Sequence, residues 1–168
     1  MEDQHKRILA VDIRGRSFGF AVFEGPSRLL DWGARSFRHG VNAVKIPASE
    51  KFAALMDQFS PDVVVLRKSH GDDNKKRCER RGIFLRQAAK RRIPARFLSR
   101  RVVKNAFLGF NRNKYTIAAA LTQQLPELAP KLPTVHKIWM SEEYWISVFD
   151  AAALGVAYYR QIRIPRSA

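Results

Sequence analysis

Short apolar runs alternate with turn residues along the first part of the chain. Residues 8–13 and 18–23 are apolar and rich in β-branched or aromatic side chains, which predicts two buried strands that pair through a turn at 14–17. Turn residues at 24–27 precede a third apolar segment, and we expect a strand over 29–37. The chain therefore begins with antiparallel strands.

Helical and strand patterns alternate over the rest of the chain. The unbroken apolar run in 62–66 is typical of a strand with parallel neighbours. The prolines at 126, 130 and 133 predict a loop. The other expected elements are helices over 44–59, 75–92, 102–108, 114–125 and 141–159, and a strand over 95–98. Antiparallel strands followed by β–α units predict an α/β fold, a mixed sheet with helices on its faces, within one domain over 1–168.

Composition excludes several classes of protein. No apolar run approaches the ~20 residues that a membrane helix requires, and the first residues lack the apolar segment of a signal peptide, so we expect a cytoplasmic protein. Cys78 is the single cysteine, which excludes an intrachain disulfide or a thiolate zinc cluster. The 168 residues include 31 Lys or Arg and 15 Asp or Glu, and the net charge of +16 points to a polyanionic partner.

The positive charge is concentrated in one segment. Residues 67–114 contain 17 Lys or Arg and only three acidic residues, so this segment holds +14 of the +16. A solvated charged helix face normally interleaves Glu with Lys, whereas a nearly acid-free segment predicts contact with nucleic-acid phosphates. An anionic membrane surface is the alternative, but the basic helix lacks the broad aromatic face of an interfacial helix.

Two aspartates interrupt apolar elements. Asp12 lies within the first strand, and Asp150 lies among small and apolar residues of the last helix. An isolated carboxylate in such a strand costs several kcal/mol unless a cation or hydrogen-bond donors compensate it. Asp12 either caps the turn at Gly15 or belongs to a site. Because small residues let a helix dock closely on a sheet, Asp150 is placed to face Asp12, as in a pair of carboxylates that holds a divalent cation.

Four motifs in sequence order resemble the RuvC-type Holliday-junction resolvases of the RNase H-like superfamily. They are Ile8-Leu9-Ala10-Val11-Asp12 with Gly15 and Gly19-Phe20-Ala21-Val22, then Pro61-Asp62-Val63-Val64-Val65-Leu66, then Val102-Val103-Lys104 with Gly109 and Lys114, and finally Asp150-Ala151-Ala152-Ala153-Leu154. The resemblance spans most of the chain. It implies a five-stranded mixed sheet flanked by helices, binding of branched DNA, a role in DNA recombination and repair, and Mg²⁺ as the cofactor of an active member.

The chain departs from this family at two of the four metal-binding carboxylates. Arg67 stands where the family has a catalytic Glu after the fourth strand, and Ser147 stands where it has a second helix Asp. Of the family's catalytic and metal-binding set, Asp12 and Asp150 remain. Since a guanidinium can take a cation's place between carboxylates, we expect Arg67 to bridge this pair and supplant the metal.

Three functions remain open at this point. The first is recognition of branched or structured nucleic acid by a protein with a degenerate metal site. The second is an active Mg²⁺-dependent junction endonuclease that recruits a third acid, for which Glu143 is the nearest candidate on the helix. Glu143 lies ~10 Å from Asp150 along the helix axis, which favours an ordinary surface position for it. The third is a scaffolding or RNA-binding role in a larger assembly.

Several residues are candidates for nucleic-acid contact. Lys104 and Lys114 match family positions implicated in DNA contact, and the cations that flank them are Arg100, Arg101 and Arg112. Phe110 could stack on an unpaired base, while Phe107 is expected in the core. His70 lies in the loop where the family has an aromatic residue that enters the junction. His136 and Trp139 have no assignable chemistry.

The helix over 75–92 corresponds to the family's dimer helix, so the resemblance implies a homodimer. Its expected apolar stripe consists of Cys78, Gly82, Leu85 and Ala89. Self-pairing requires this stripe to form the contact while the many positive charges point outward.

Overall fold

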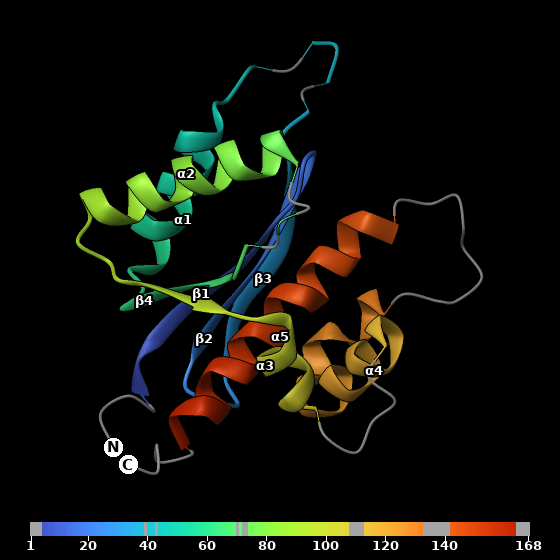
Figure 1. The fold of residues 1–168 in the computed structure, drawn as a ribbon. Helices are drawn as coiled ribbons and strands as arrows, with labels where there is room; N and C mark the ends of the chain where they lie inside the picture. Colours follow the sequence, from blue (N-terminus) through green and yellow to red (C-terminus); the bar gives the residue numbers. More distant parts are fainter. Residues whose placement is uncertain are drawn as a thin grey trace.

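The computed structural model describes residues 5–38, 40–42, 44–69, 71, 74–107, 113–132 and 142–163, and of these the side chains of 142–144 and 163 are excepted. A five-stranded sheet in the order β3-β2-β1-β4-β5 forms the centre of the molecule (Figure 1). The strands are β1 (Arg7–Ile13), β2 (Ser17–Glu24), β3 (Leu29–Ser36), β4 (Val63–Arg67) and β5 (Ala95–Leu98). The predicted α/β fold with a mixed five-stranded sheet is confirmed.

The sheet is antiparallel on one side and parallel on the other. β1 pairs antiparallel with β2 and parallel with β4, and β4 pairs parallel with β5. The four apolar residues of β4 from Val63 to Leu66 are buried, as expected for a strand with parallel neighbours on both sides. β1 is buried from Ile8 to Ile13, so Asp12 lies inside the protein.

Helices cover both faces of the sheet. α1 (Ala48–Phe59) and α2 (Lys75–Lys90) lie on one face, and α5 (Glu142–Arg163) crosses the other face beside the shorter helices (Figure 1). Those shorter helices are α3 (Arg100–Asn105), α4 (Lys114–Gln124) and the 3-10 helix η2 (Pro126–Lys131). Within the described residues, no helix has both the length and the apolar character needed to span a bilayer.

Several elements differ from the expectation in boundary or type, and the helix expected over 102–108 spans Arg100–Asn105. The first helix begins at Ala48 and not at 44, because the residue before Pro47 is restricted to extended backbone, and Val44 and Ile46 stay exposed. The basic helix ends at Lys90, and Arg92 adopts a positive φ of 56° that ends helical geometry. The expected proline loop forms a 3-10 helix with proline in its first turn, where the missing amide proton costs nothing.

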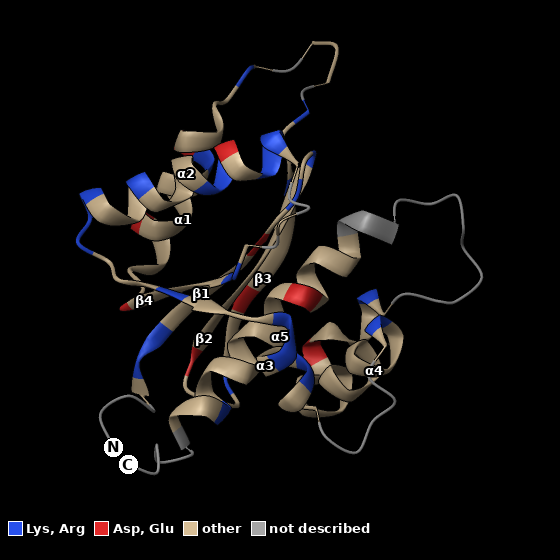
Figure 2. Cartoon of the chain, viewed as in Figure 1, with Lys and Arg blue, Asp and Glu red and all other residues tan. Residues whose placement is uncertain are grey.

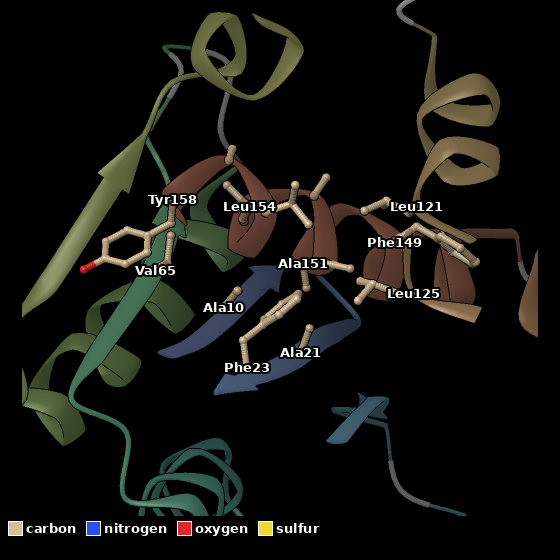
Figure 3. Packing of buried hydrophobic residues seen from close by; sticks show 14 of the residues in the cluster. Ala10, Ala21, Phe23, Val65, Leu121, Leu125, Phe149, Ala151, Leu154 and Tyr158 are labelled. Atoms are coloured by element: carbon tan, nitrogen blue, oxygen red, sulfur yellow. The ribbon is translucent and has the colours of Figure 1, made fainter. Parts of the chain in front are cut away.

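Close contact between α5 and the sheet determines where the site lies. Ala10 and Ala21 on the strands face Ala151 on the helix, so the backbones approach closely (Figure 3). At Gly19 there is no room for any side chain, since a Cβ there would lie 2.2 Å from the backbone of Ser147. Gly19 is also the antiparallel partner of Asp12. The small residues therefore bring α5 against the strand that holds Asp12.

Candidate nucleic-acid site beside a carboxylate pair

Asp12 and Asp150 meet at the point where α5 crosses β1. Asp12 is 7% exposed and Asp150 is 18% exposed, so both carboxylates are largely shielded from water. A single guanidinium joins them, because Arg14 donates from Nε to Asp12 across 2.7 Å and from Nη2 to Asp150 across 2.6 Å. Asp12 therefore binds arginine and belongs to a side-chain cluster with Asp150.

Arg67 is the second cation at this cluster. In the parallel register Val11 pairs with Leu66, so the next residue of β4 arrives beside Asp12. Its Nη2 lies 3.5 Å from Asp12 Oδ1 and 3.2 Å from Asp150 Oδ2, the bridging geometry that the sequence predicted. Two arginines and two aspartates thus form a cluster whose formal charges cancel.

The ionisation of these groups follows from burial and from their neighbours. Burial raises the pKa of Asp150 and the charge on Asp12 raises it further, while Arg67, Arg14 and Lys114 pull it down without cancelling the rise. Burial would lower the pKa of Arg67, but Asp12 and Asp150 outweigh it and raise that pKa, so the guanidinium stays charged. Burial of the Asp150 carboxylate costs desolvation free energy, and its contacts with the two arginines offset only part of that cost.

Sequence reasoning missed Arg14. It assigned this residue to the turn after the first strand, and its amide does close that turn by donating to the carbonyl of Ser17. A signal was present, because residues two positions apart along an extended chain point to the same side, which places the side chain of Arg14 on the side of Asp12. The contact between Arg14 and Asp150 could not be predicted in this way, because it forms only when α5 docks on the sheet.

The donor set of this cluster does not suit a divalent ion. Asp12 and Asp150 are the two carboxylates brought together, and the described residues contain no group of three or more His, Cys, Asp or Glu suited to a metal. Ser147, at the position where the resemblance expects an acid, is fully buried against the backbone contact with Gly19. Mg²⁺ requires about six oxygen ligands, and here two arginines already contact both oxygens of Asp12 and Oδ2 of Asp150.

A basic cavity opens directly beside Asp150. Its volume is about 320 Å³, and α3, α4, β4 and α5 all contribute to its wall. The lining residues are Arg67, Arg100, Val103, Lys104, Asn113, Lys114, Ile117 and Asp150. Three of the candidate nucleic-acid contacts, Arg100, Lys104 and Lys114, are therefore brought together, although they come from two separate helices.

Other candidates lie elsewhere. Arg101 is exposed on α3 and does not line the cavity. Phe107 is fully buried, which confirms its expected place in the core. The candidate residues that lie outside the described part of the chain are His70, Phe110, Arg112, His136 and Trp139, and the side chain of Glu143 also lies outside it.

α2 buries other residues than those of the expected apolar stripe. Phe84 and Ala88 face the core, whereas Cys78 and Ala89 are exposed. Figure 2 shows the charge of α2 on one side of the sheet and further Lys and Arg on α3 and α4 on the other. The basic segment is therefore divided between two faces.

The sheet order, its mixed pairing and the long α5 against β1 define an RNase H-like fold of the RuvC type. The structure of Thermus thermophilus RuvC in complex with a Holliday junction substrate is similar, with a TM-score of 0.68, 16% identity, and coverage of 96% of this chain and 97% of that one. The fowlpox virus resolvase in its complex with Holliday junction DNA has a TM-score of 0.57 and 15% identity over 93% and 98% of the two chains. The yeast mitochondrial resolvase Ydc2 has a TM-score of 0.56 and 12% identity over 93% and 80%. No protein-family model matches the sequence, and a search of curated proteins found no match.

Proposed function

We propose that this protein binds branched nucleic acid through the basic cavity beside Asp150 and does so without a divalent metal. One observation carries the proposal: Arg14 and Arg67 neutralise the aspartate pair from within the chain. A carboxylate pair that already has two cationic partners gains little from a third. Binding of Mg²⁺ would require both guanidinium groups to give up charge-assisted hydrogen bonds or close ion pairs.

The cavity supplies the affinity. Arg100, Lys104 and Lys114 surround an opening in which Asp150 is the one acidic residue among those that line it. Cations in this arrangement neutralise backbone phosphates and release counterions, which gives binding that depends on salt and not on base sequence. The preference for branched nucleic acid draws support from the fold, because two similar structures are complexes with Holliday junction substrates.

Binding and cleavage measurements in parallel test this function. Labelled four-way DNA junction, duplex DNA of the same sequence and a four-way RNA junction are titrated with the protein in EDTA and again in Mg²⁺. We expect the DNA junction to bind most tightly in both buffers, with no gain of affinity in Mg²⁺ and no cleavage. Lys114→Glu should weaken binding to all ligands. Arg28→Met should not weaken it, because Arg28 is exposed and follows the end of β2 that is remote from Gly19 and Asp12.

Two outcomes would replace the proposal. Cleavage in Mg²⁺ that disappears in Asp12→Asn would identify an active endonuclease. Preference for the RNA junction over the DNA junction would favour the scaffolding or RNA-binding role.

The homodimer through the 75–92 helix stays a prediction. Exposed Cys78 and Ala89 give α2 a short strip of small side chains among its charges. Light scattering on the eluting protein would measure its mass, and a dimer that Ala89→Glu converts to a monomer would support this interface. A monomer at all concentrations would exclude it.

A further inference from the structure

The two arginines of the carboxylate cluster are held unequally. Arg14 is 15% exposed and uses two different nitrogens, Nε and Nη2, on Asp12 and Asp150 at 2.7 and 2.6 Å. Arg67 is 32% exposed, and both of its contacts involve Nη2 alone at 3.5 and 3.2 Å. Arg14 is thus the fixed counterion of the pair, and Arg67 is its looser partner.

Arg67 also faces the cavity, whereas Arg14 is not among the lining residues. The Nε and Nη1 of Arg67 make no hydrogen bond to the part of the chain that the structure describes. The N–H groups on these two nitrogens are therefore available to a ligand. A guanidinium is planar and presents its donors in pairs that match two oxygens of one phosphate. The neighbours at the cavity wall, Arg100, Lys104 and Lys114, add charge of the same sign.

We propose that Arg67 binds a nucleic-acid phosphodiester in this cavity while its Nη2 remains on Asp12 and Asp150. The guanidinium then links the carboxylate pair to the phosphate, a connection made by one side chain of the protein itself. The cavity of about 320 Å³ lies at the small end of ligand sites and admits one nucleotide-sized group. This inference rests on the proposed function and assigns one phosphate contact to one residue.

The slope of log affinity against log salt concentration counts phosphate contacts, and it tests the assignment directly. In EDTA, with four-way DNA junction as the ligand, we expect Arg67→Met to reduce the slope by about 0.9 and to weaken binding roughly tenfold at about 50 mM salt. Arg28→Met is the matched control and should keep the slope of the unmodified protein. An unchanged slope in a folded Arg67→Met variant would overturn the inference.

A measurement on the unmodified protein avoids any dependence on how the variant folds. Phenylglyoxal modifies accessible guanidinium groups, and mass spectrometry of the digested protein reports each arginine separately. We expect a dinucleoside monophosphate, which has one internal phosphodiester, to protect Arg67 and to leave Arg28 reactive. Absence of protection at Arg67 would overturn the inference. Protection by a 5′-mononucleotide but not by the dinucleoside monophosphate would assign the cavity to strand ends and overturn the phosphodiester assignment.

The two proposals fail in different ways. If the unmodified protein does not bind the junction in EDTA, the proposed function itself fails. If it binds with a salt slope that Arg67→Met does not change, the function stands and only the role of Arg67 is withdrawn.

Discussion

Arg14 and Asp150 lie 136 positions apart in the sequence and are joined by a hydrogen bond of 2.6 Å. The same guanidinium binds Asp12 on the central strand. One side chain thus ties α5 to β1 and also offsets two carboxylates that the fold has shielded from water. The stability of the protein and the charge state of its site depend on the same residue.

Replacing Arg14 with Met should destabilise the protein strongly. The variant leaves Arg67 as the guanidinium that contacts both Asp12 and Asp150, and removing one partner of a buried ion pair costs about 3 kcal/mol or more. Urea denaturation measures the free energy of unfolding. Arg28→Met removes an exposed arginine from an ion pair with Glu24 and should cost less than about 1 kcal/mol. Equal losses in the two variants would show that the cluster contributes no more than a surface pair.

The raised pKa of Asp150 makes stability depend on pH with a defined sign. Because this pKa lies above the ordinary value of 3.8, the folded protein binds the proton more tightly than the unfolded chain does. The contribution of Asp150 to the free energy of unfolding therefore falls as pH rises from about 4 through the folded-state pKa. Subtracting the unfolding free energy of Asp150→Asn from that of the unmodified protein isolates this contribution.

Asp57 provides a control of opposite sign. A hydrogen bond from Arg91 lowers the pKa of Asp57, so its contribution to stability is present above pH 4 and is lost as pH falls through the folded-state pKa. The same subtraction with Asp57→Asn should give a difference that rises with pH, and a small one because the pair is exposed. A difference for Asp150→Asn that also rises with pH would contradict the raised pKa.

Changing Arg67 to Glu should create affinity for a divalent ion. The variant removes one competing guanidinium and places a third carboxylate beside Asp12 and Asp150, so Mn²⁺ gains oxygen ligands. Ligand that binds the folded state raises the melting temperature. We expect Mn²⁺ to stabilise Arg67→Glu but neither the unmodified protein nor the neutral variant Arg67→Gln. Stabilisation of the unmodified protein by Mn²⁺ would contradict the neutralised cluster.

Adding one methyl group at Gly19 should separate α5 from the sheet. The new Cβ would lie 2.2 Å from the carbonyl group of Ser147, and backbone atoms cannot move aside cheaply. We expect Gly19→Ala to cost several kcal/mol, as severe overpacking does, and to weaken junction binding because α5 forms part of the cavity wall and is displaced. Gly71→Ala is the control, since a Cβ there meets nothing within 4 Å. Similar melting temperatures for the two variants would refute the close contact.

The sequence by itself determined most of the elements, because their signals are local. The apolar run of β4 predicted its parallel pairing, and the strands β1 and β2 followed from β-branched and aromatic residues around a turn. Asp12 and Asp150 stood out because a carboxylate is costly in an apolar element wherever the element lies. Arg67 was found through the resemblance, and the parallel register then placed it beside Asp12.

Only the tertiary structure decided which cations pair with Asp12 and Asp150 and which residues surround this cluster. Arg14 contacts Asp150 because α5 docks against Gly19, a contact between distant segments that no local pattern encodes. The cavity exists because α3 and α4 meet α5 beside the end of β4, which gathers Arg100, Lys104 and Lys114 around Asp150. Side-chain periodicity specifies which face of an element is buried, whereas packing between elements specifies which partners a buried charge receives, and ion pairing depends on those distances.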